Sequence, residues 1–222
     1  MMANFYSSVR PPSMLRTLVR TWRLRDDSLR VEGIQQRQIL LTFDDGPHPI
    51  NTPALLDELK QAGILATFFV VGKNLETPSG MKLIQRAVAE GHQIGNHTYS
   101  HRHLTTLKAD QIREEILTTE KLIGTANNGL KLLRPPYGAH NSLVQQVAQD
   151  LGYNLFFWNV DTLDWHPSYK EGRWVNHAME QIMIQEQTIL LAHDIHATTV
   201  NKVGKLIAHI KSLSNSTFVQ YS

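Results

Sequence analysis

Residues 39–46 read Ile-Leu-Leu-Thr-Phe-Asp-Asp-Gly, an apolar run that ends in two adjacent carboxylates. A short run of aliphatic and aromatic residues followed by turn formers is typical of a buried strand. Aspartate and glycine are common in turns, so Asp44-Asp45-Gly46 taken alone is equally well explained as a turn. A turn does not explain why two charges stand directly behind the apolar run. The stretch therefore predicts a buried strand with chemistry at its carboxyl end.

Short apolar runs and longer amphipathic stretches alternate along the rest of the chain. Further strands are expected at residues 66–71, 93–95, 130–133, 154–158, 188–192 and 217–219. Helices are expected at residues 53–62, 80–90, 108–124, 142–151, 172–186 and 199–213. Thr52-Pro53 predicts a capped start for the first helix, and Gly63, Gly91 and Gly152 stand where helices are expected to end. The pattern indicates an α/β fold, a parallel sheet or barrel, in one domain from residue 38 to residue 222.

Composition narrows the class of protein. The chain has 222 residues, of which 41% are hydrophobic and 19% charged, as expected of one globular domain with a real core. These values exclude a largely disordered chain, a coiled coil and a collagen-like fibre. No apolar stretch approaches the ~18–20 residues of a membrane-spanning helix. The absence of cysteine excludes disulfide scaffolds, thiolate metal sites and cysteine nucleophiles.

The basic charge of the chain lies in an N-terminal arm. Residues 1–37 carry seven arginines and three acids, a net charge of +4, whereas the remaining residues carry a net charge of −2. A body so close to neutral does not predict a nucleic-acid partner. Arginines interrupt the apolar residues of the arm, so it does not resemble a secretory signal, and the chain as given is expected in the cytoplasm unless an export segment is missing.

Part of the arm has helical spacing. Leu15, Leu18, Val19 and Trp22 recur at this spacing, with arginines between them. Three interpretations remain open, namely a helix packed on the rim of the domain, a helix on a membrane surface and a transit-peptide-like segment. The membrane-surface interpretation implies that the arm associates weakly with a membrane surface or a polymer.

Polar clusters follow the expected strands. They are Asp44-Asp45, His97 with His101, Arg134 to Gly138, Asp161 with Asp164 and Trp165, and His193-Asp194. In α/β barrels and open parallel sheets, ligands bind at the carboxyl ends of the strands. Clusters from five strands are therefore expected to converge on one mouth.

The two histidines of the second cluster are spaced as metal ligands often are. On a helical turn, His97 and His101 would lie on one face, as in H-x-x-x-H zinc sites, although two histidines alone are a weak signal. A carboxylate from another strand would complete three protein ligands and leave a position open for water. Asp44 and Asp45 are expected to point to opposite sides of the strand and to divide two roles, metal ligand and proton acceptor.

Two other clusters have both a structural and a chemical interpretation. Arg134-Pro-Pro-Tyr-Gly138 fits a rigid loop, and its arginine could pair bidentately with a buried carboxylate. His193 is explained equally well as a polar residue that ends a strand and as an imidazole that donates a proton to a leaving group.

Taken together, the motifs resemble a known family. The segments Thr42-Phe-Asp-Asp-Gly-Pro47, His97-Thr-Tyr-Ser-His101, Arg134-Pro-Pro-Tyr-Gly138, Asp161-Thr-Leu-Asp-Trp165 and Leu191-Ala-His-Asp194 are similar to the five ordered motifs of the polysaccharide deacetylases. This is the NodB-homology family, carbohydrate esterase family 4. The resemblance extends from about residue 38 to residue 215, and it implies a distorted (β/α) barrel with about seven parallel strands.

The resemblance also implies a role for each matching residue. Asp45, His97 and His101 would hold a divalent cation, usually Zn²⁺, with Co²⁺ or another divalent ion as alternatives. Asp44 would be the general base for the attacking water, with Arg134 orienting its carboxylate. His193 would be the general acid, tuned by Asp164. The remaining roles belong to the substrate pocket: the backbone N–H of Tyr137 would bind the oxyanion, Trp165 would wall the site and Leu191 would line the pocket for the acetate methyl.

The implied activity is removal of N-acetyl groups from N-acetylglucosamine-type units of a glycan. Chitooligosaccharides and peptidoglycan are the leading substrates, and an esterase for O-acetylated polysaccharide is an alternative. A non-catalytic glycan-binding relative would not need both an acid and a base, and a metal-free relative that cleaves cyclic imides would lack the full metal triad. His103 and His48 lie near these motifs and are expected to be a spectator and an ordinary loop histidine.

Overall fold

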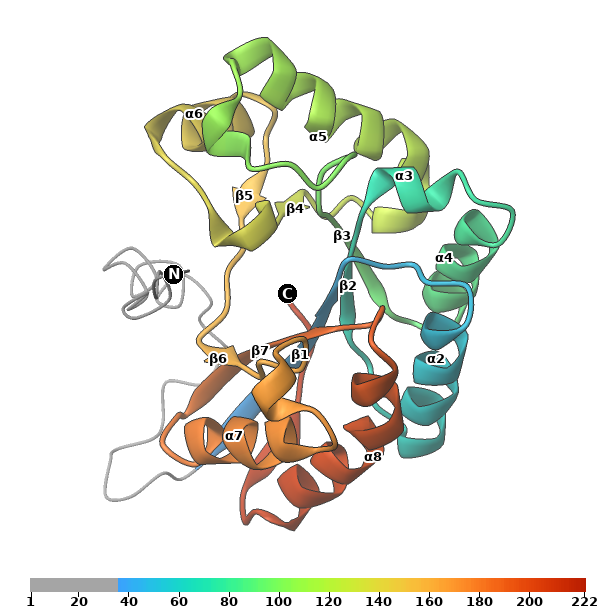
Figure 1. Ribbon diagram of the computed structural model, residues 1–222, viewed down its shortest axis with the longest axis vertical. Helices are drawn as coiled ribbons and strands as arrows, with labels where there is room; N and C mark the ends of the chain where they lie inside the picture. The colour runs from blue at the N-terminus through green and yellow to red at the C-terminus, as the bar shows by residue number, and fades with distance from the viewer. Residues whose placement is uncertain (1–35) are drawn as a thin grey trace.

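The computed structural model describes residues 36–222, so the basic arm expected at residues 1–37 lies outside the described residues except for its last two. Strands and helices alternate along the described chain, which confirms the α/β class (Figure 1). The strands are β1 (Arg37–Asp44), β2 (Thr67–Val70), β3 (Gln93–Asn96), β4 (Leu132–Leu133), β5 (Asn154–Leu155), β6 (Val160–Asp161), β7 (Gln187–His193) and β8 (Ser216–Phe218).

All strand pairs are parallel, and the sheet curls into a half-barrel. Its order is β5-β4-β3-β2-β1-β7-β6, with β8 paired to β1 off this path. β5 and β6 are the two ends of the order, and Figure 1 shows the sheet open between them. The path therefore holds seven strands, in agreement with the barrel expected from the motifs. β6 was not among the expected strands. β4 and β5 are equally short, but each lies within a longer apolar run, whereas Val160 stands between Asn159 and Asp161.

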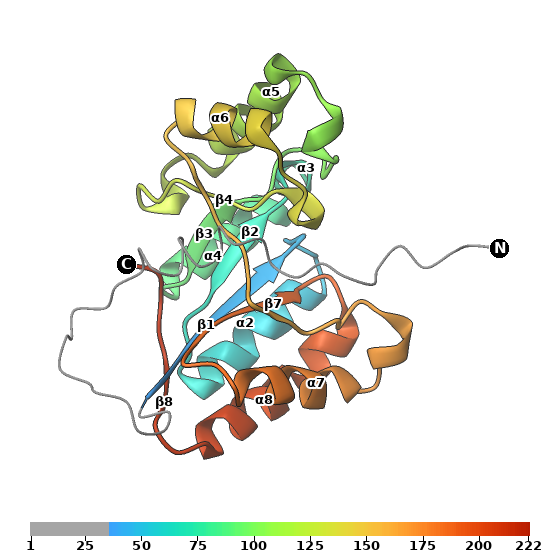
Figure 2. The same cartoon turned by 90° about the vertical axis from the view of Figure 1, so that its left-hand side faces the viewer.

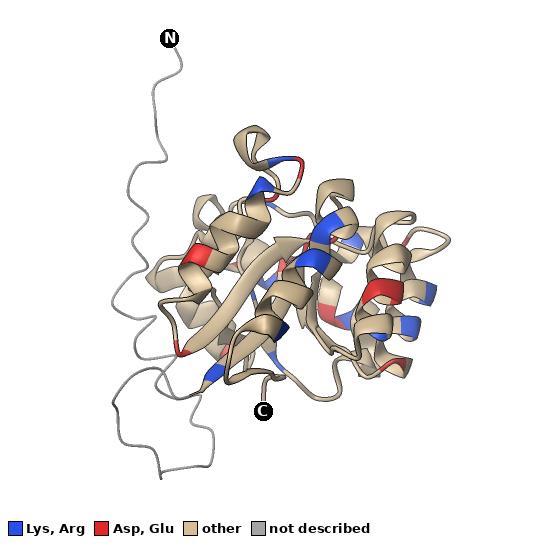
Figure 3. Cartoon of the chain, turned by 90° about the horizontal axis from the view of Figure 1, so that it is seen from below, with Lys and Arg blue, Asp and Glu red and all other residues tan. Residues whose placement is uncertain are grey.

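Helices cover the convex outer side of the half-barrel (Figures 1 and 2). They are α2 (Asn51–Ala62), α3 (Gly72–Leu75), α4 (Gly80–Ala89), α5 (Ala109–Ile123), α6 (Ser142–Asp150), α7 (Arg173–Ile182) and α8 (Ala197–Ser212). Short 3₁₀ turns are η1 (Leu104–Thr106), η2 (Gly124–Asn127), η3 (Pro136–Gly138) and η4 (Pro167–Tyr169). Charged residues of both signs are spread over the outer helices (Figure 3). No helix within residues 36–222 combines the length and apolar character needed to cross a membrane.

The start of α2 differs from the expectation. Thr52 does not cap the helix, because the helix begins at Asn51 and Thr52 lies within it. Its hydroxyl accepts from the backbone N–H of His48 and donates to the buried carboxylate of Asp194. The ring of His48 serves the helix start instead, since its Nδ1 accepts from the backbone N–H of Asn51 at 3.1 Å. Gly63 ends the helix in the left-handed conformation, as expected.

β1 supplies both sides of the sheet with buried residues. Ile39, Leu41 and Phe43 belong to the main core under the outer helices, whereas Leu40 belongs to a cluster on the inner side of the curl. Because side chains alternate along a strand, Thr42 and Asp44 share the inner face with Leu40. The alternation explains how one apolar strand delivers a carboxylate to the interior of the half-barrel.

Candidate active site

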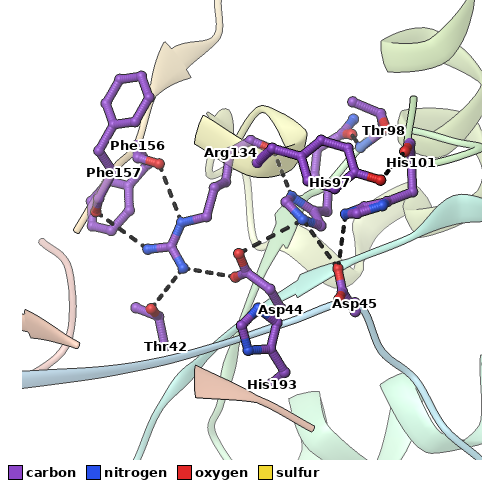
Figure 4. A network of polar contacts seen from close by, with 12 residues as sticks. Thr42, Asp44, Asp45, His97, Thr98, His101, Arg134, Phe156, Phe157 and His193 are labelled. Carbon is purple, nitrogen blue, oxygen red and sulfur yellow. Dashed lines mark hydrogen bonds and ion pairs between the residues drawn. The ribbon is translucent and has the colours of Figure 1, made fainter. Parts of the chain in front are cut away.

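Polar side chains from strands far apart in the sequence lie together at one edge of the half-barrel (Figure 4). This edge is formed by the carboxyl ends of the strands and is called the mouth. β1 ends at Asp44 and β7 ends at His193, and these residues are register partners on neighbouring strands. β3 ends one residue before His97, and β4 one residue before Arg134. Parallel strands bring their carboxyl ends to one edge, which is why separate motifs meet here.

Asp44 is buried against a cationic side chain that is itself buried. Nη1 of Arg134 donates to Oδ1 of Asp44 and to the hydroxyl of Thr42, each at 2.7 Å. Nε and Nη2 donate to the carbonyl oxygens of Phe156 and Phe157. The expected bidentate pair is therefore a single contact to Asp44, because the guanidinium also binds three other oxygens.

The charge of Arg134 is fixed. Burial lowers the pKa of Arg134 and the charge of Asp44 raises it, and an arginine remains protonated in proteins at any ordinary pH. The guanidinium also lies over the ring of Phe69, 4.1 Å from its centroid. Asp44 consequently faces a permanent positive charge on one side and the mouth on the other.

Asp45, His97 and His101 form a compact group beside Asp44. One potential ligand atom of each lies within 4.8 Å of the others. Oδ1 of Asp45 is 3.0 Å from Nε2 of His101 and 3.3 Å from Nε2 of His97. Burial opposes the charge of Asp45, but the two imidazoles outweigh it and hold the pKa of this carboxyl well below its usual range.

The group fits a divalent metal ion. Oδ1 of Asp45 is buried and makes no well-formed hydrogen bond, although two imidazole nitrogens point toward it. Nδ1 of His97 lies 2.6 Å from the carbonyl oxygen of Arg134, and a carbonyl only accepts, so Nδ1 carries the proton. Nε2 is then the nitrogen that faces Asp45 and is left to bind an ion. An imidazole fixed in this tautomer by a carbonyl is the usual arrangement behind a metal ligand.

The backbone brings these groups together in a way that differs from the expectation. Residues 97–101 are a loop and not a helical turn, since Thr98 and His101 have positive φ angles of 67° and 57°. The two carboxylates also do not lie on opposite sides. Asp45 turns with a φ of 75°, so that Asp44 and Asp45 lie 3.7 Å and 3.3 Å from the same Nε2 of His97.

On the other side of the mouth, His193 is held by a buried carboxylate. Nδ1 of His193 is 2.7 Å from Oδ1 of Asp164, and Oδ2 of Asp164 accepts from the backbone N–H of His193 and from the hydroxyl of Thr199. Burial lowers the pKa of His193, but Asp164 outweighs this and raises it to about 9. Burial likewise raises the pKa of Asp164, and His193 and Thr199 shift it to below its ordinary value. The pair is therefore ionic at neutral pH.

Leu191, Trp165 and Tyr137 are the three expected substrate-pocket residues. Leu191 is buried in β7 as the register partner of Thr42, so it lies on the same inner face. Trp165 is 38% exposed and has its ring edge-on to His166. Tyr137 is 58% exposed, in the left-handed conformation, with its ring stacked on His103 at 3.9 Å between centroids. His103 therefore contacts an expected site residue, and its expected lack of a chemical role stays a prediction.

Some supporting residues have no expected role in the sequence. Thr199 binds Asp164 from 35 positions away, and sequence spacing gives no signal of such a contact. Asp194 was expected only to end a strand. Its carboxyl is buried below Gly46, where no side chain would fit, and burial raises its pKa to about 7.

The arrangement brings a carboxylate, an imidazole and a possible metal-ligand set to one edge of the sheet. Asp44 is paired with a cation that does not titrate at ordinary pH, and His193 can release a proton. These groups together are suited to hydrolysis of an acyl bond, in which water loses one proton and the leaving group gains one.

Comparisons with known proteins agree with the motifs. A family model described as polysaccharide deacetylase matches residues 33–156. The peptidoglycan-N-acetylglucosamine deacetylase PgdA of Listeria monocytogenes is 37% identical over 179 residues, which are 79% of this chain and 36% of that protein. A chitooligosaccharide deacetylase of Rhizobium leguminosarum bv. phaseoli is 36% identical over 168 residues, 74% of this chain and 71% of that protein.

A solved structure described as T48 deacetylase with substrate has a TM-score of 0.75 and 38% identity, and the likeness covers 86% of this chain and 92% of that one. The chain spans only about a third of the length of the first of these relatives, PgdA. The family match nevertheless covers more than half of the 222 residues and includes the strands that carry Asp44, His97 and Arg134. On this evidence the chain belongs to the polysaccharide deacetylase family.

Proposed function

We propose that this chain removes N-acetyl groups from N-acetylglucosamine-type units of a glycan, with chitooligosaccharides and peptidoglycan fragments as its substrates. One observation carries the proposal. An anionic base and a cationic acid, Asp44 and His193, are register partners on adjacent strands beside the Asp45–His97–His101 group. In acyl hydrolysis a positioned base can take a proton from water and a positioned acid can give one to the leaving group.

We assign Asp45, His97 and His101 to a divalent ion, with Zn²⁺ as the first choice because its sites combine histidine and carboxylate ligands. When bound, such an ion supplies Lewis acidity for the acyl carbonyl and for the attacking water. The carbonyl of Arg134 holds the tautomer of His97 that this binding requires.

The proton steps belong to the protein. Asp44 accepts a proton from the attacking water, and Arg134 holds one oxygen of that carboxylate through a hydrogen bond of 2.7 Å. The backbone N–H of Tyr137 donates to the oxygen that becomes negative, as an oxyanion hole does. His193 then gives its proton to the leaving amine, and Asp164 stabilises the imidazolium until that transfer. Leu191 receives the acetate methyl, and Trp165 bounds the sugar side.

The test is mass spectrometry of products from chitooligosaccharides, peptidoglycan fragments and acetylated xylan, each incubated with the full chain. Loss of acetyl mass from the first two substrates, abolished by a chelator and restored by Zn²⁺ or Co²⁺, is the expected result. Release of acetate from xylan alone would assign an esterase instead. Glycan binding without any loss of acetyl, in protein loaded with metal, would identify a non-catalytic relative and overturn the proposal.

A further inference from the structure

The loop between β3 and η1 carries both imidazoles of the metal-ligand group, yet it has no regular secondary structure. Residues 97–101 begin where β3 ends, and two of them, Thr98 and His101, have left-handed φ angles of 67° and 57°. Such angles are unfavourable for residues with side chains and persist only where surrounding contacts impose them. The contacts that impose them here come from a carboxylate outside the five motifs.

Glu115 on α5 binds the middle of this loop. One carboxylate oxygen, Oε2, accepts from the backbone N–H of Tyr99 at 3.0 Å and from that of Ser100 at 2.8 Å. The other oxygen, Oε1, accepts from the hydroxyl of Ser100. Three donors from two consecutive residues thus converge on one side chain, and these two residues lie between the left-handed ones.

The position of Glu115 is unusual for an acidic residue. It is only 8% exposed and shares the buried face of α5 with Ile112, Ile116 and Thr119. Burial of a carboxylate is strongly unfavourable unless hydrogen bonds compensate for the lost water. Hydrogen bonds to a charged acceptor are about twice as strong as neutral ones. A buried acid with three donors therefore holds the loop more firmly than an apolar residue could.

The carbonyl side of the loop is fixed from α3. The backbone N–H groups of Gly72 and Lys73 donate to the carbonyl oxygens of Thr98 and Tyr99 at 2.9 Å and 3.0 Å. At Gly72 a Cβ would lie 2.6 Å from the hydroxyl oxygen of Thr119, one turn after Glu115 on α5. Together α3 and α5 hold the donors and the acceptors of the same two peptide units.

We infer that Glu115 is a positioning residue for the metal-ligand pair, acting through the backbone of Tyr99 and Ser100 to set the separation and direction of His97 and His101. The inference rests on the metal site of the proposed function and not on the identity of the glycan. It predicts that the affinity for metal depends on a side chain that never touches the ion.

The experiment measures Zn²⁺ affinity of the full chain by competition with a chromophoric chelator, without substrate. The test variant is Glu115→Gln, in which an amide NH₂ replaces one of the two accepting oxygens. The matched control is Glu114→Gln, an exposed acid one position earlier on the same helix. Supporting groups behind metal ligands typically contribute 10–100-fold to affinity, and we expect a loss of about this size for Glu115→Gln and none for Glu114→Gln.

Ser100→Ala provides a second test variant. This substitution removes one donor and retains the carboxylate of Glu115, so we expect a smaller loss of Zn²⁺ affinity. If Glu115→Gln does not fold, Ser100→Ala alone tests the inference. The fold is monitored by circular dichroism and by the unfolding midpoint of the metal-free protein. Saturating Zn²⁺ should return the kcat of both variants to within a few-fold of the parent, because neither residue faces substrate.

The inference is overturned if well-folded Glu115→Gln binds Zn²⁺ as tightly as Glu114→Gln, or if its kcat stays low at saturating Zn²⁺. The Zn²⁺ affinity is measured without glycan, so its result does not depend on deacetylation. Glu115→Gln can bind Zn²⁺ normally even if the parent protein deacetylates glycans, and it can bind Zn²⁺ weakly even if the parent does not. Failure of this inference is therefore distinguishable from failure of the proposed function.

Discussion

Two buried aspartates face the mouth, each bound to one cationic side chain, and their partners make them different. Asp44 is bound to Arg134, which is fully buried and does not titrate at ordinary pH. Asp164 is bound to His193, whose pKa is about 9. The cation of the first pair keeps its proton at any ordinary pH, whereas the cation of the second pair releases its proton near pH 9.

The supporting contacts of the two pairs follow the same division. Arg134 binds carbonyl oxygens from the segment after β5, so the pair joins β1 to distant parts of the sheet. Within residues 36–222, the carboxylate of Asp164 accepts from the imidazole and the backbone of His193 and from the hydroxyl of Thr199. The base side thus has a fully buried cation with four acceptors, whereas the cation of the acid side is partly exposed and held by one carboxylate. The predictions below test this contrast.

The largest expected effect is on turnover. We expect Asp44→Asn and His193→Ala each to lower kcat by ~10²–10⁴, the usual contribution of a positioned acid or base, with bound metal retained. Asp45→Ala should lose metal and activity together, since Asp45 belongs to the ligand group. Metal stoichiometry by elemental analysis, measured beside kcat on one oligosaccharide, separates these outcomes. If Asp44→Asn loses the metal while Asp45→Ala retains it, the two roles are reversed.

A stability measurement compares the two pairs directly. Arg134→Met leaves Asp44 buried without its cation, and the removal of one partner of a buried ion pair typically costs about 3–5 kcal/mol. His193→Gln should reduce the free energy of unfolding by less, because Asp164 keeps two other donors. Urea unfolding of both variants in the metal-free state gives the two values. Equal losses would show that the base side is no more integrated into the fold than the acid side.

The sequence predicted the parts of this contrast that depend on local pattern. The apolar run that ends at Asp44 and its alternation with helices were sufficient to predict the fold class. Burial and hydrophobic periodicity can both be recognised in short segments of sequence. β6 was missed because Val160 stands between Asn159 and Asp161, so that no apolar run marks the strand. The spacing of His97 and His101 suggested a helical turn, and the structure has left-handed residues there because Glu115 and α3 hold the loop.

Long-range polar contacts were not predictable in the same way. Thr199 and Asp164 are too far apart in the sequence for any motif to connect them. Glu115 did carry a signal, since it interrupts the buried stripe of Ile112, Ile116 and Thr119 on α5. An acid at a core position of an amphipathic helix is worth attention before a structure is known, because its burial requires donors from elsewhere.

The proton affinity of His193 should depend on its carboxylate. In Asp164→Asn the main cause of the raised pKa is gone while burial remains, so the pKa of His193 should fall from about 9 toward the ordinary 6.5. Because the folded pKa is raised, the pair stabilises the parent fully below pH 6.5, and this contribution is lost as pH rises through about 9. NMR titration of His193 in metal-free protein measures the shift. An unchanged pKa of His193 in Asp164→Asn would show that a group other than Asp164 stabilises the cationic imidazole.

The smallest effects come from the two threonines that support the pairs. Thr199→Val removes a donor to the carboxylate of Asp164, and Thr42→Val removes an acceptor for Arg134 together with a donor to the carbonyl of Leu190. Each loss involves a hydrogen bond to a charged group, so we expect about 1.5–3 kcal/mol of the free energy of unfolding for either variant.

The pH dependence of these two losses should differ. Thr199 helps to lower the pKa of Asp164 to below 3.8, so its contribution is present above pH 3.8 and disappears as pH falls through the lowered folded value. The contribution of Thr42 to Arg134 should stay constant over the same range, because the guanidinium does not titrate there. Urea unfolding of both variants and the parent between neutral and acidic pH measures the two differences. If Thr199→Val reduces the free energy of unfolding equally at acidic pH, the hydroxyl supports packing and not the charge of Asp164. The stability of the acid side would then be as independent of pH as that of the base side.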